Sequence, residues 1–525
     1  MNFRSVNSNA NPRVFAKMKK SLVLSFLAYL LPAAAVAQQS TTIPVALDGP
    51  FARVVHPENA PTKRDARGYP STWSTIYGNA QRNAGLLSGI AENGADGGGV
   101  SWQYAEARAW PLDRPAFDFE SDGVKGAETT AAQWMGNAVG VSVAGGVVFG
   151  ASSDQFVYAV NARTGKLIWR TSPVGTTFMG QPLVVDNLVY VNAGTVGFNY
   201  SNVQRYQKTG SAVRGAGVAY NGIYALDRET GKLIWRYATA GDAMPTPTVS
   251  HGRLAFSTGA GEIISLDSKT GQKIWQSNVG GMGNMSSPAV ADGRIFVGMA
   301  SPAFLYALDE TTGRTLWRAS IAGSVNTGMG DVSPAVSDGV VVTDAVSHPS
   351  TDNPVAKSVA GSRPPGGDVL PQISVSASTT MDMSIAAFDA STGKMLWSHV
   401  TARGPKPPSF KGGVPMIHDG VVYVGNPVTS SYQALALKTG QLLWAWQVPD
   451  PSEAGSGRGP AAYYNGRLYI ATGDALYALD PKTGRLLKET KIGGRFGITG
   501  PTIANNTIYT GNAWDWILAV PLSML

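Results

Sequence analysis

The stretch from Ile223 to Trp235, IYALDRETGKLIW, is repeated with small changes along the chain. Leu305 to Trp317 reads LYALDETTGRTLW and keeps the same Ala-Leu-Asp and Thr-Gly elements. Related copies end at Trp169, Trp275, Trp397, Trp444 and, with lysine in the tryptophan position, Lys488. A repeat of this length is one supersecondary unit that cannot bury its own faces, so successive copies must pack on one another. The copies therefore predict a repeat architecture for most of the chain.

Each copy has the residue chemistry of a β-hairpin. A β-branched and aromatic run alternates like a strand, Asp or Asn followed by Thr-Gly supplies the turn, and a second short run returns to the tryptophan. Upstream lie two more short strands, such as Ser333 to Val336 and Val340 to Thr343, joined at Asp338-Gly339. Four antiparallel strands per unit form one blade of a propeller, so the predicted fold class is an all-β propeller.

The number of blades follows from the turn glycines of the seven copies. These are Gly165, Gly231, Gly271, Gly313, Gly393, Gly440 and Gly484. Their positions give a basic unit of 40 to 47 residues, with insertions at Asn192 to Ala219 and Ala345 to Met383 that read as loops. An eighth unit can be assembled from Ile498 to Val520 and an N-terminal strand within Trp73 to Trp102, which would close the ring and remove its free edge. We predict eight blades, with seven as the alternative.

The first 37 residues read as a secretory signal. Met18, Lys19 and Lys20 precede an apolar run from Leu22 to Leu31, and Ala35-Val36-Ala37 supplies a small-x-small cleavage site. The apolar run is shorter than the roughly 20 residues that span a bilayer, so no stable membrane span is expected. The sequence thus predicts a signal peptide at 1–37, one propeller domain at 38–525, and a periplasmic or extracellular location.

Charge and cysteine content exclude several classes of function. Residues 1–37 hold five basic residues and no acid, so without them the formal charge falls from +7 to +2 and no basic stripe for nucleic acid remains. The chain has no cysteine, which excludes disulfides, thiolate nucleophiles and thiolate metal sites. The five histidines show no metal-ligand spacing, so no metal is predicted. Only 15% of residues are charged, a composition that suits an acidic compartment, with a β protein rich in Gly, Thr and Ser as the alternative explanation.

The repeat resembles the quinoprotein (PQQ-type) propeller superfamily. Its A-x-D-x-x-T-G-x-x-x-W hairpin is similar to that group's tryptophan-docking motif, and WSTIYGNAQRNA, which begins at Trp73, is similar to its opening segment. The resemblance covers nearly all of the chain after the signal and implies an eight-bladed propeller with docked tryptophans. One fold hosts several activities, so the resemblance alone leaves function open.

Three families within this superfamily are candidates. The quinone-dependent alcohol dehydrogenases hold their cofactor beside a vicinal cysteine pair, and the outer-membrane assembly propellers, which are not enzymes, carry a lipidated cysteine. The absence of cysteine argues against both, although both stay as alternatives. The chain looks most like the acid-active tetrathionate hydrolases of sulfur-oxidising acidophiles. That resemblance implies a secreted homodimer that hydrolyses a sulfur–sulfur bond of tetrathionate to thiosulfate, sulfur and sulfate without a cofactor.

Residues at equivalent positions of the repeats can be compared to find a candidate catalytic residue. Most innermost strands begin with a proline, and three residues before it stand Met179, Met244, Met285 and then Asp331. One blade thus has a carboxylate where the others have methionine, at the mouth of the expected channel. We predict Asp331 as the general acid or base, with a turn-capping role as the alternative and Asp344 and Asp352 as further candidates. A carboxyl group with a pKa near 3.9 suits acid–base work at roughly pH 2 to 4.

A dianion such as tetrathionate needs fixed cations and polar groups around it. Lys411, Arg458 and Arg495 stand on successive loops at the expected mouth, although each taken singly also reads as a solvated surface charge. Trp134, Asn137 and Gln181 occupy corresponding places in the first two blades and are predicted to line the pocket, with packing as the alternative for Trp134.

Overall fold

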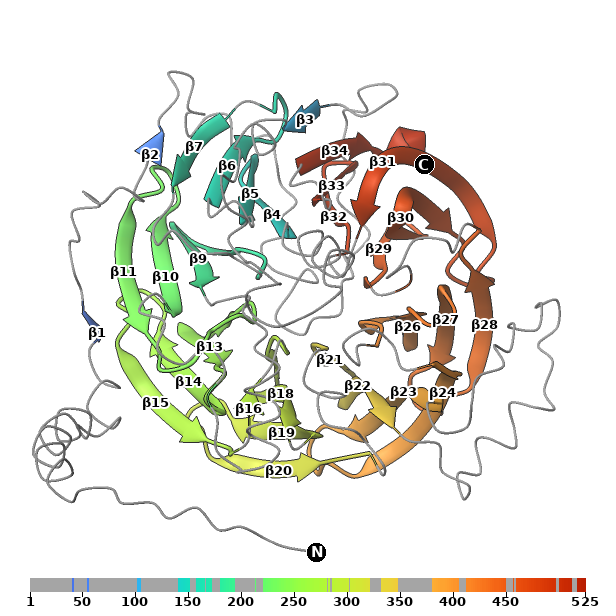
Figure 1. Ribbon diagram of the computed structural model, residues 1–525, viewed down its shortest axis with the longest axis horizontal. Helices are drawn as coiled ribbons and strands as arrows, with labels where there is room; N and C mark the ends of the chain where they lie inside the picture. The colour runs from blue at the N-terminus through green and yellow to red at the C-terminus, as the bar shows by residue number, and fades with distance from the viewer. Residues whose placement is uncertain are drawn as a thin grey trace, which may run out of the picture. The chain divides into compact units, whose positions relative to one another are not determined.

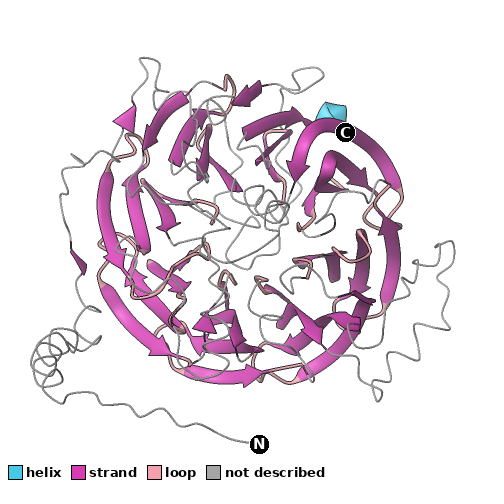
Figure 2. Ribbon diagram, viewed as in Figure 1, coloured by secondary structure: helices cyan, strands magenta, loops and turns pink. Residues whose placement is uncertain are grey.

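The chain forms eight antiparallel β-sheets, as a computed structural model describes it (Figures 1 and 2). All described residues lie in the compact unit Ser40–Leu525. They are residues 40–41, 54–55, 102–104, 140–151, 157–165, 167–171, 180–193, 213, 221–280, 282–283, 286–301, 303–321, 332–347, 380–405, 412–449, 457, 459–496, 500–511 and 517–525. The predicted signal peptide at 1–37 lies outside them.

Blades 1 to 4 have the same order of strands from the inside outward. Blade 1 holds β4 (Gly140–Ala144), β5 (Val147–Ala151), β6 (Val157–Asn161) and β7 (Leu167–Thr171). Blade 2 holds β8 (Leu183–Val185), β9 (Leu188–Ala193), β10 (Gly222–Asp227) and β11 (Leu233–Ala238). Blade 3 holds β12 (Thr248–Ser250), β13 (Arg253–Ser257), β14 (Glu262–Asp267) and β15 (Lys273–Asn278). Blade 4 holds β17 (Ala289–Ala291), β18 (Arg294–Ser301), β19 (Ala303–Asp309) and β20 (Thr315–Ala319), with β16 (Met282–Gly283) also paired to β18.

Blades 5 to 8 continue the pattern with longer strands. Blade 5 holds β21 (Ala335–Ser337), β22 (Val340–Ser347), β23 (Thr380–Asp389) and β24 (Met395–Pro405). Blade 6 holds β25 (Met416–His418), β26 (Val421–Asn426), β27 (Ser431–Ala436) and β28 (Leu442–Gln447). Blade 7 holds β29 (Ala462–Tyr464), β30 (Arg467–Leu479) and β31 (Leu486–Phe496), where β30 supplies both middle strands. Blade 8 holds β32 (Thr502–Ala504), β33 (Thr507–Gly511) and β34 (Ile517–Pro521). The predicted eight blades are confirmed, and seven is wrong.

Short N-terminal strands pair with three outer edges. β1 (Ser40–Thr41) pairs with β11, β2 (Val54–Val55) with β7, and β3 (Trp102–Tyr104) with β34. The last pairing gives blade 8 a fourth strand, and buried residues of blades 1 and 8 share one hydrophobic cluster. Closure of the ring by an N-terminal strand stays a prediction, to be tested by truncation.

The turn between the two innermost strands shows why these sequences fold as they do. In blade 5 both turn residues have positive φ, 50° at Asp338 and 71° at Gly339, which matches the right-handed twist of the strands on either side. Asp and Gly are the residues that tolerate this conformation. The strand β22 then pairs with β23 from Val340 to Ser347, so residues 345–347 and 380–383 of the predicted fifth-blade insertion are strand.

Each repeated tryptophan lies against the turn of the following blade. A Cβ built on the turn glycine would come within 2.4 to 2.6 Å of the indole ring in every described case, so only glycine fits. Five indoles also donate Nε1–H to a carbonyl of that turn at 2.7 to 3.1 Å: Trp169 to Arg228, Trp275 to Glu310, Trp317 to Ala390, Trp397 to Leu437 and Trp444 to Pro481. At Trp235 the corresponding carbonyl of Ser268 accepts from the Tyr190 hydroxyl instead, at 2.8 Å.

The seam between blades 7 and 8 is fastened differently, because Lys488 replaces the tryptophan. A short 3-10 helix, Leu522–Met524, follows β34 at the chain's end. Thr490 Oγ1 of β31 donates to the Met524 carbonyl at 2.7 Å. Arg467 Nη1 donates to the carbonyl of the buried Leu525 at 3.0 Å.

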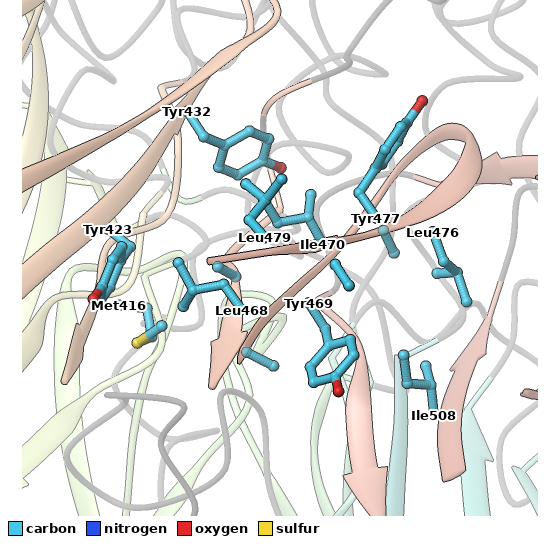
Figure 3. Close-up of a cluster of buried hydrophobic side chains, with 14 of the residues drawn as sticks. Met416, Tyr423, Tyr432, Leu468, Tyr469, Ile470, Leu476, Tyr477, Leu479 and Ile508 are labelled. Atoms are coloured by element: carbon cyan, nitrogen blue, oxygen red, sulfur yellow. The ribbon is translucent and has the colours of Figure 1, made fainter. Parts of the chain in front are cut away.

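The core is distributed between the blades. The largest cluster of buried apolar residues spans blades 6, 7 and 8, with Tyr432, Leu476 and Ile508 among its members (Figure 3). Innermost strands of neighbouring blades contact one another in six places: β4 with β8, β12 with β17, β17 with β21, β21 with β25, β29 with β32, and β32 with β4. The described residues contain no helix that is long and apolar enough to cross a membrane. They also hold no group of three or more His, Asp or Glu side chains that could bind a metal.

Candidate substrate-binding and catalytic site

The strand connections define two faces of the ring. We call the loop face the end at which β22, β23 and β24 reach Ser347, Thr380 and Pro405, because the connections to the next blade leave from there. The opposite end carries the docking turns and is the turn face. The innermost strands start at the loop face, and six of them begin directly after a proline, at positions 182, 247, 288, 334, 415 and 501. The predicted site residues thus belong to sequence segments that enter this face.

Most of the predicted site residues lie outside the described part of the chain. They are Asp331, Lys411, Arg458, Trp134 and Asn137, together with Asp352. Arg495 belongs to β31, next to its last residue, and its side chain lies outside the described part as well. Their roles therefore stay predictions from the sequence.

Gln181 is the predicted site residue whose side chain the structure describes. It is 3% exposed, and its backbone N–H donates to Thr246 Oγ1 of blade 3 at 2.9 Å. Its side-chain Nε2 donates to the Val141 carbonyl and, at 3.2 Å, to Ser142 Oγ of blade 1. These bonds tie three blades together and occupy the amide donor. A role for Gln181 in binding substrate stays a prediction.

The sheet register identifies a second carboxylate that breaks the repeat. In each blade, the fourth residue after the start of the second strand lies near the loop face. These residues are Ala151, Asn192, Ser257, Gly298, Asp344, Gly425, Ala471 and Gly511. Asp344 is the only charged residue among them, and it is 3% exposed. A buried carboxylate is costly, and seven blades fold without one at this place, so its presence indicates function.

The Asp344 carboxylate reaches the loop that enters blade 6. A Cβ built on Gly412 would lie 1.9 Å from Asp344 Oδ2, so the carboxylate occupies the space that any other side chain there would need. Gly412 directly follows Lys411 in the sequence. The buried acid is thus fixed against the backbone of a loop that carries one of the predicted cations.

Close backbone contacts continue from that loop to the next one. A Cβ on Gly413 would lie 1.8 Å from the Gly425 carbonyl oxygen, and a Cβ on Gly425 would lie 2.1 Å from the Gly457 carbonyl oxygen. Gly457 itself has φ +85° and leaves no room for a side chain beside the Asn426 carbonyl. Glycines therefore let the loops before Pro415 and Pro460 pack directly on β26. Such packing fixes the backbone at Gly413 and Gly457, which lie within two residues of Lys411 and Arg458 in the sequence.

A seam of polar side chains joins blades 5 and 6 near the loop face. Asn426 Nδ2 donates to Thr401 Oγ1 at 2.8 Å, and Thr401 Oγ1 donates to the Met383 carbonyl at 3.1 Å. Gln433 Nε2 donates to the Thr401 carbonyl at 2.8 Å, and the Gln433 side chain also hydrogen-bonds His399. Burial lowers the pKa of the His399 imidazole below its ordinary value, and the bond to Gln433 offsets this in part. The seam therefore favours a neutral His399.

This seam predicts how stability changes with pH. The pKa of His399 is lower in the folded protein than in the unfolded chain. The contribution of neutral His399 to the free energy of unfolding is therefore fully present above about pH 6.5, and it is lost as pH falls towards the lowered pKa. We expect His399→Gln to lose less thermal stability than the wild type between pH 7.5 and pH 4. Thermal melts across this range test it, with the variant at pH 7.5 as its own reference. Parallel stability curves for the two proteins would contradict the assignment.

The outer strands of blade 5 are joined by an ion pair between a buried carboxylate and an exposed arginine. Asp382 and Arg403 face each other across β23 and β24, with Nε to Oδ1 at 2.6 Å and Nη2 to Oδ2 at 2.9 Å. Asp382 is 1% exposed, so both carboxylate oxygens are held by the guanidinium in a fork geometry. The hydrogen bonds that Arg403 donates to Asp382 raise the Arg403 pKa. This pair holds the two strands together beyond the length that the other blades share.

The docking turns are suited to acidic conditions. Asp389 Oδ1 accepts from the Ser391 hydroxyl at 2.6 Å and from the Thr392 hydroxyl at 2.9 Å, and these bonds lower its pKa to about 2. The Thr312 hydroxyl likewise lowers the pKa of Asp309. Since the lowered pKa favours the ionised form, the stabilisation by Asp389 is complete above about pH 4 and is lost only as pH falls towards 2. The turns therefore keep their hydrogen-bonding pattern at moderately acidic pH.

The chain is similar to known proteins along most of its length. Four overlapping segments, residues 88–213, 211–289, 261–456 and 431–515, match the repeat family described as outer membrane protein assembly factor BamB. A tetrathionate hydrolase from Acidithiobacillus ferrooxidans is 45% identical over 509 residues, which cover 96% of this chain and 97% of that protein. The chain belongs to the tetrathionate hydrolase family.

A more distant relative agrees with this assignment. Another tetrathionate hydrolase, from Acidianus ambivalens, is 32% identical over 87% of this chain and 85% of its own length. Among solved structures, a europium-containing methanol dehydrogenase covers 85% of this chain and 90% of its own, with a TM-score of 0.50 and 12% identity. That likeness concerns the propeller fold alone.

Proposed function

We propose that this protein hydrolyses tetrathionate at acidic pH. Water cleaves a sulfur–sulfur bond, so that one tetrathionate and one water give one thiosulfate, one sulfur atom in elemental form, one sulfate and two protons. The observation that carries the proposal is the 45% identity to a tetrathionate hydrolase over nearly the whole of both chains. The lowered pKa of the turn aspartates supports work at low pH.

Blade 5 supplies the acid–base chemistry in this proposal. Asp331 is the candidate from the repeat sequence, and Asp344 is the buried carboxylate on the neighbouring strand of the same blade. One carboxylate takes the proton of the attacking water, and a carboxyl group returns a proton to the departing sulfur. No cofactor or metal takes part in the proposed step.

The substrate carries a sulfonate at each end, which calls for cations at two places. We assign these to Lys411, Arg458 and Arg495, on segments of blades 6 and 7. Trp134, Asn137 and Gln181 are proposed to line the opposite side. The close packing of the glycine loops on β26 supports two of the cation positions, because it fixes the backbone close to Lys411 and Arg458 in the sequence.

The proposal includes secretion and self-association. Residues 1–37 are proposed to direct the chain to the periplasm or outside the cell and to be removed there. The mature protein is proposed to act as a homodimer, which light scattering of the purified protein tests. A mass corresponding to one chain would contradict that part.

An assay of the purified protein with tetrathionate tests the function. We expect thiosulfate release at about pH 3, loss of turnover towards neutral pH and no effect of a chelator. Thiosulfate and sulfate should form in equal amounts, as the equation requires. Failure to release thiosulfate from tetrathionate across roughly pH 2 to 5 would refute the proposal.

A further inference from the structure

Tyr432 replaces an aliphatic residue of the repeat. It lies on the third strand of blade 6, four residues before the residue that opens the docking turn. The residues at this position in the other blades are Val157, Ile223, Ile263, Leu305, Ile385, Leu476 and Ile517. All eight side chains are 2% exposed or less, and Tyr432 and Leu476 belong to the cluster in Figure 3. A hydroxyl thus stands where seven blades have only carbon.

That hydroxyl reaches the next loop. Tyr432 Oη donates to the Gly459 carbonyl at 3.0 Å, across the boundary between blades 6 and 7. Gly425, which pairs with Tyr432 on the neighbouring strand, makes room, because a Cβ there would lie 2.9 Å from the Tyr432 ring. Burial raises the Tyr432 pKa far above its ordinary value, so the hydroxyl keeps its proton at every working pH. It is a permanent donor to the loop.

A second bond holds the same loop two residues earlier. The Gly457 N–H donates to Thr472 Oγ1 at 2.9 Å, and the Thr472 side chain also hydrogen-bonds Tyr432. Both residues that flank position 458 are therefore anchored to buried hydroxyl groups. The residue between these anchors in the sequence is Arg458.

Packing alone does not account for a tyrosine here. Burying a hydroxyl costs free energy unless it is hydrogen-bonded, and phenylalanine would fill the same space without that requirement. The hydroxyl meets that requirement by bonding to the Gly459 carbonyl and to the Thr472 side chain, which are both attached to the loop around position 458. The effect of the hydroxyl is therefore to fix the backbone of the loop. A fixed backbone is most useful where a cationic side chain must bind an anion in one particular geometry.

We propose that Tyr432, with Thr472, is a positioning residue for the anion site. The two hydroxyl groups fix the backbone on both sides of Arg458, so that its guanidinium meets one end of the dianion without a loss of loop entropy on binding. The identity of the anion rests on the proposed function. The positioning itself concerns any dianion with sulfonate-like oxygens, such as sulfate or thiosulfate.

Tyr432→Phe is the direct test. We expect the KM for tetrathionate to rise by about fivefold to tenfold, with kcat within about twofold, because the lost bond orders the binding loop and does not touch the reacting atoms. Thr472→Val should act in the same direction. Thr472→Ser, which keeps the hydroxyl, should restore a KM near that of the wild type.

Tyr423→Phe is the matched control. Tyr423 lies in the same blade, and its hydroxyl also donates to a backbone carbonyl, that of Pro481 at 3.3 Å, but at the turn face. We expect it to lower thermal stability about as much as Tyr432→Phe and to leave KM unchanged. An equal rise in KM for both variants, or no rise for Tyr432→Phe, would overturn the proposal.

Binding of sulfate and thiosulfate by calorimetry separates this inference from the proposed function. If the wild type does not turn over tetrathionate, the function proposal fails and the binding measurement decides alone. Weaker dianion binding by Tyr432→Phe than by Tyr423→Phe supports positioning. Equal binding by the two variants rejects it.

Discussion

Asp344→Asn is expected to lower kcat for tetrathionate by about 10²- to 10⁴-fold, the range over which one acid–base group contributes to catalysis. The fold should survive, because asparagine has the same shape and blade 2 already has Asn192 at the equivalent position. The substitution removes the charge and the exchangeable proton while it keeps the packing against Gly412. Steady-state kinetics at acidic pH, together with thermal melts, measure both properties.

Asp338→Asn is the matched control for this prediction. Asp338 is in the same blade, at the exposed turn between β21 and β22, where asparagine also tolerates the positive φ of 50°. It should keep kcat within about twofold. Asp331→Asn completes the set, because it tests the carboxylate that the repeat sequence singles out. Full activity in Asp344→Asn would remove this residue from the proposed chemistry and leave Asp331 as its only carboxylate.

Gly393→Ala is expected to destabilise the protein by about 2 to 5 kcal/mol. Gly393 has φ +71°, and a Cβ there would lie 2.5 Å from the indole of Trp317, so alanine must both strain the backbone and push the docked ring away. The bond from Trp317 Nε1 to the Ala390 carbonyl, 3.1 Å long, would be disturbed as well. Urea denaturation followed by tryptophan fluorescence measures the free energy of unfolding.

Gly339→Ala separates the two causes. Gly339 has the same φ of +71° in the same blade, yet a Cβ there would meet nothing within 4 Å. It should cost only the backbone strain, about 1 to 2 kcal/mol. The excess cost in Gly393→Ala is then the contribution of the docked tryptophan to the joint between blades 4 and 5. Equal costs for the two variants would show that docking adds nothing.

The propeller could be predicted from the sequence because its determinants are local and repeated. The Asp-Gly turn at Asp338, the docking glycine at Gly393 and the alternation of buried residues along the strands each determine the structure of a short segment. The seven copies of the repeat all predict the same four-stranded unit. The ends of the strands were less predictable. β22 and β23 continue to pair up to Ser347 and Asp382, within the predicted insertion, because an ion pair and buried apolar groups stabilise strand residues that lack the repeat pattern.

The candidate site could be predicted only in part. Comparison of the repeats indicates blade 5 through Asp331, with Asp344 as a further candidate. The importance of Asp344 is visible only in the structure, because it rests on the burial of its carboxylate and on the sheet register that aligns it with an uncharged residue in each of the seven other blades. Tyr432 was missed altogether. Its alignment with aliphatic residues on other third strands was a readable signal, since counting back four residues from each docking turn gives it. The partner of its hydroxyl, Gly459, could not be read from the chain.

The fastening between blades 7 and 8 has a practical consequence for handling the protein. The carbonyls of Met524 and Leu525 accept hydrogen bonds from side chains of blade 7, and Leu525 is buried. Residues 524 and 525 therefore join blades 7 and 8, as a docked tryptophan joins each pair of successive blades from blade 1 to blade 7. An affinity tag fused directly after Leu525 would have to leave the molecule from a buried position and would compete with those bonds. Purification is better served by a tag placed elsewhere, or by a cleavable one with a long spacer.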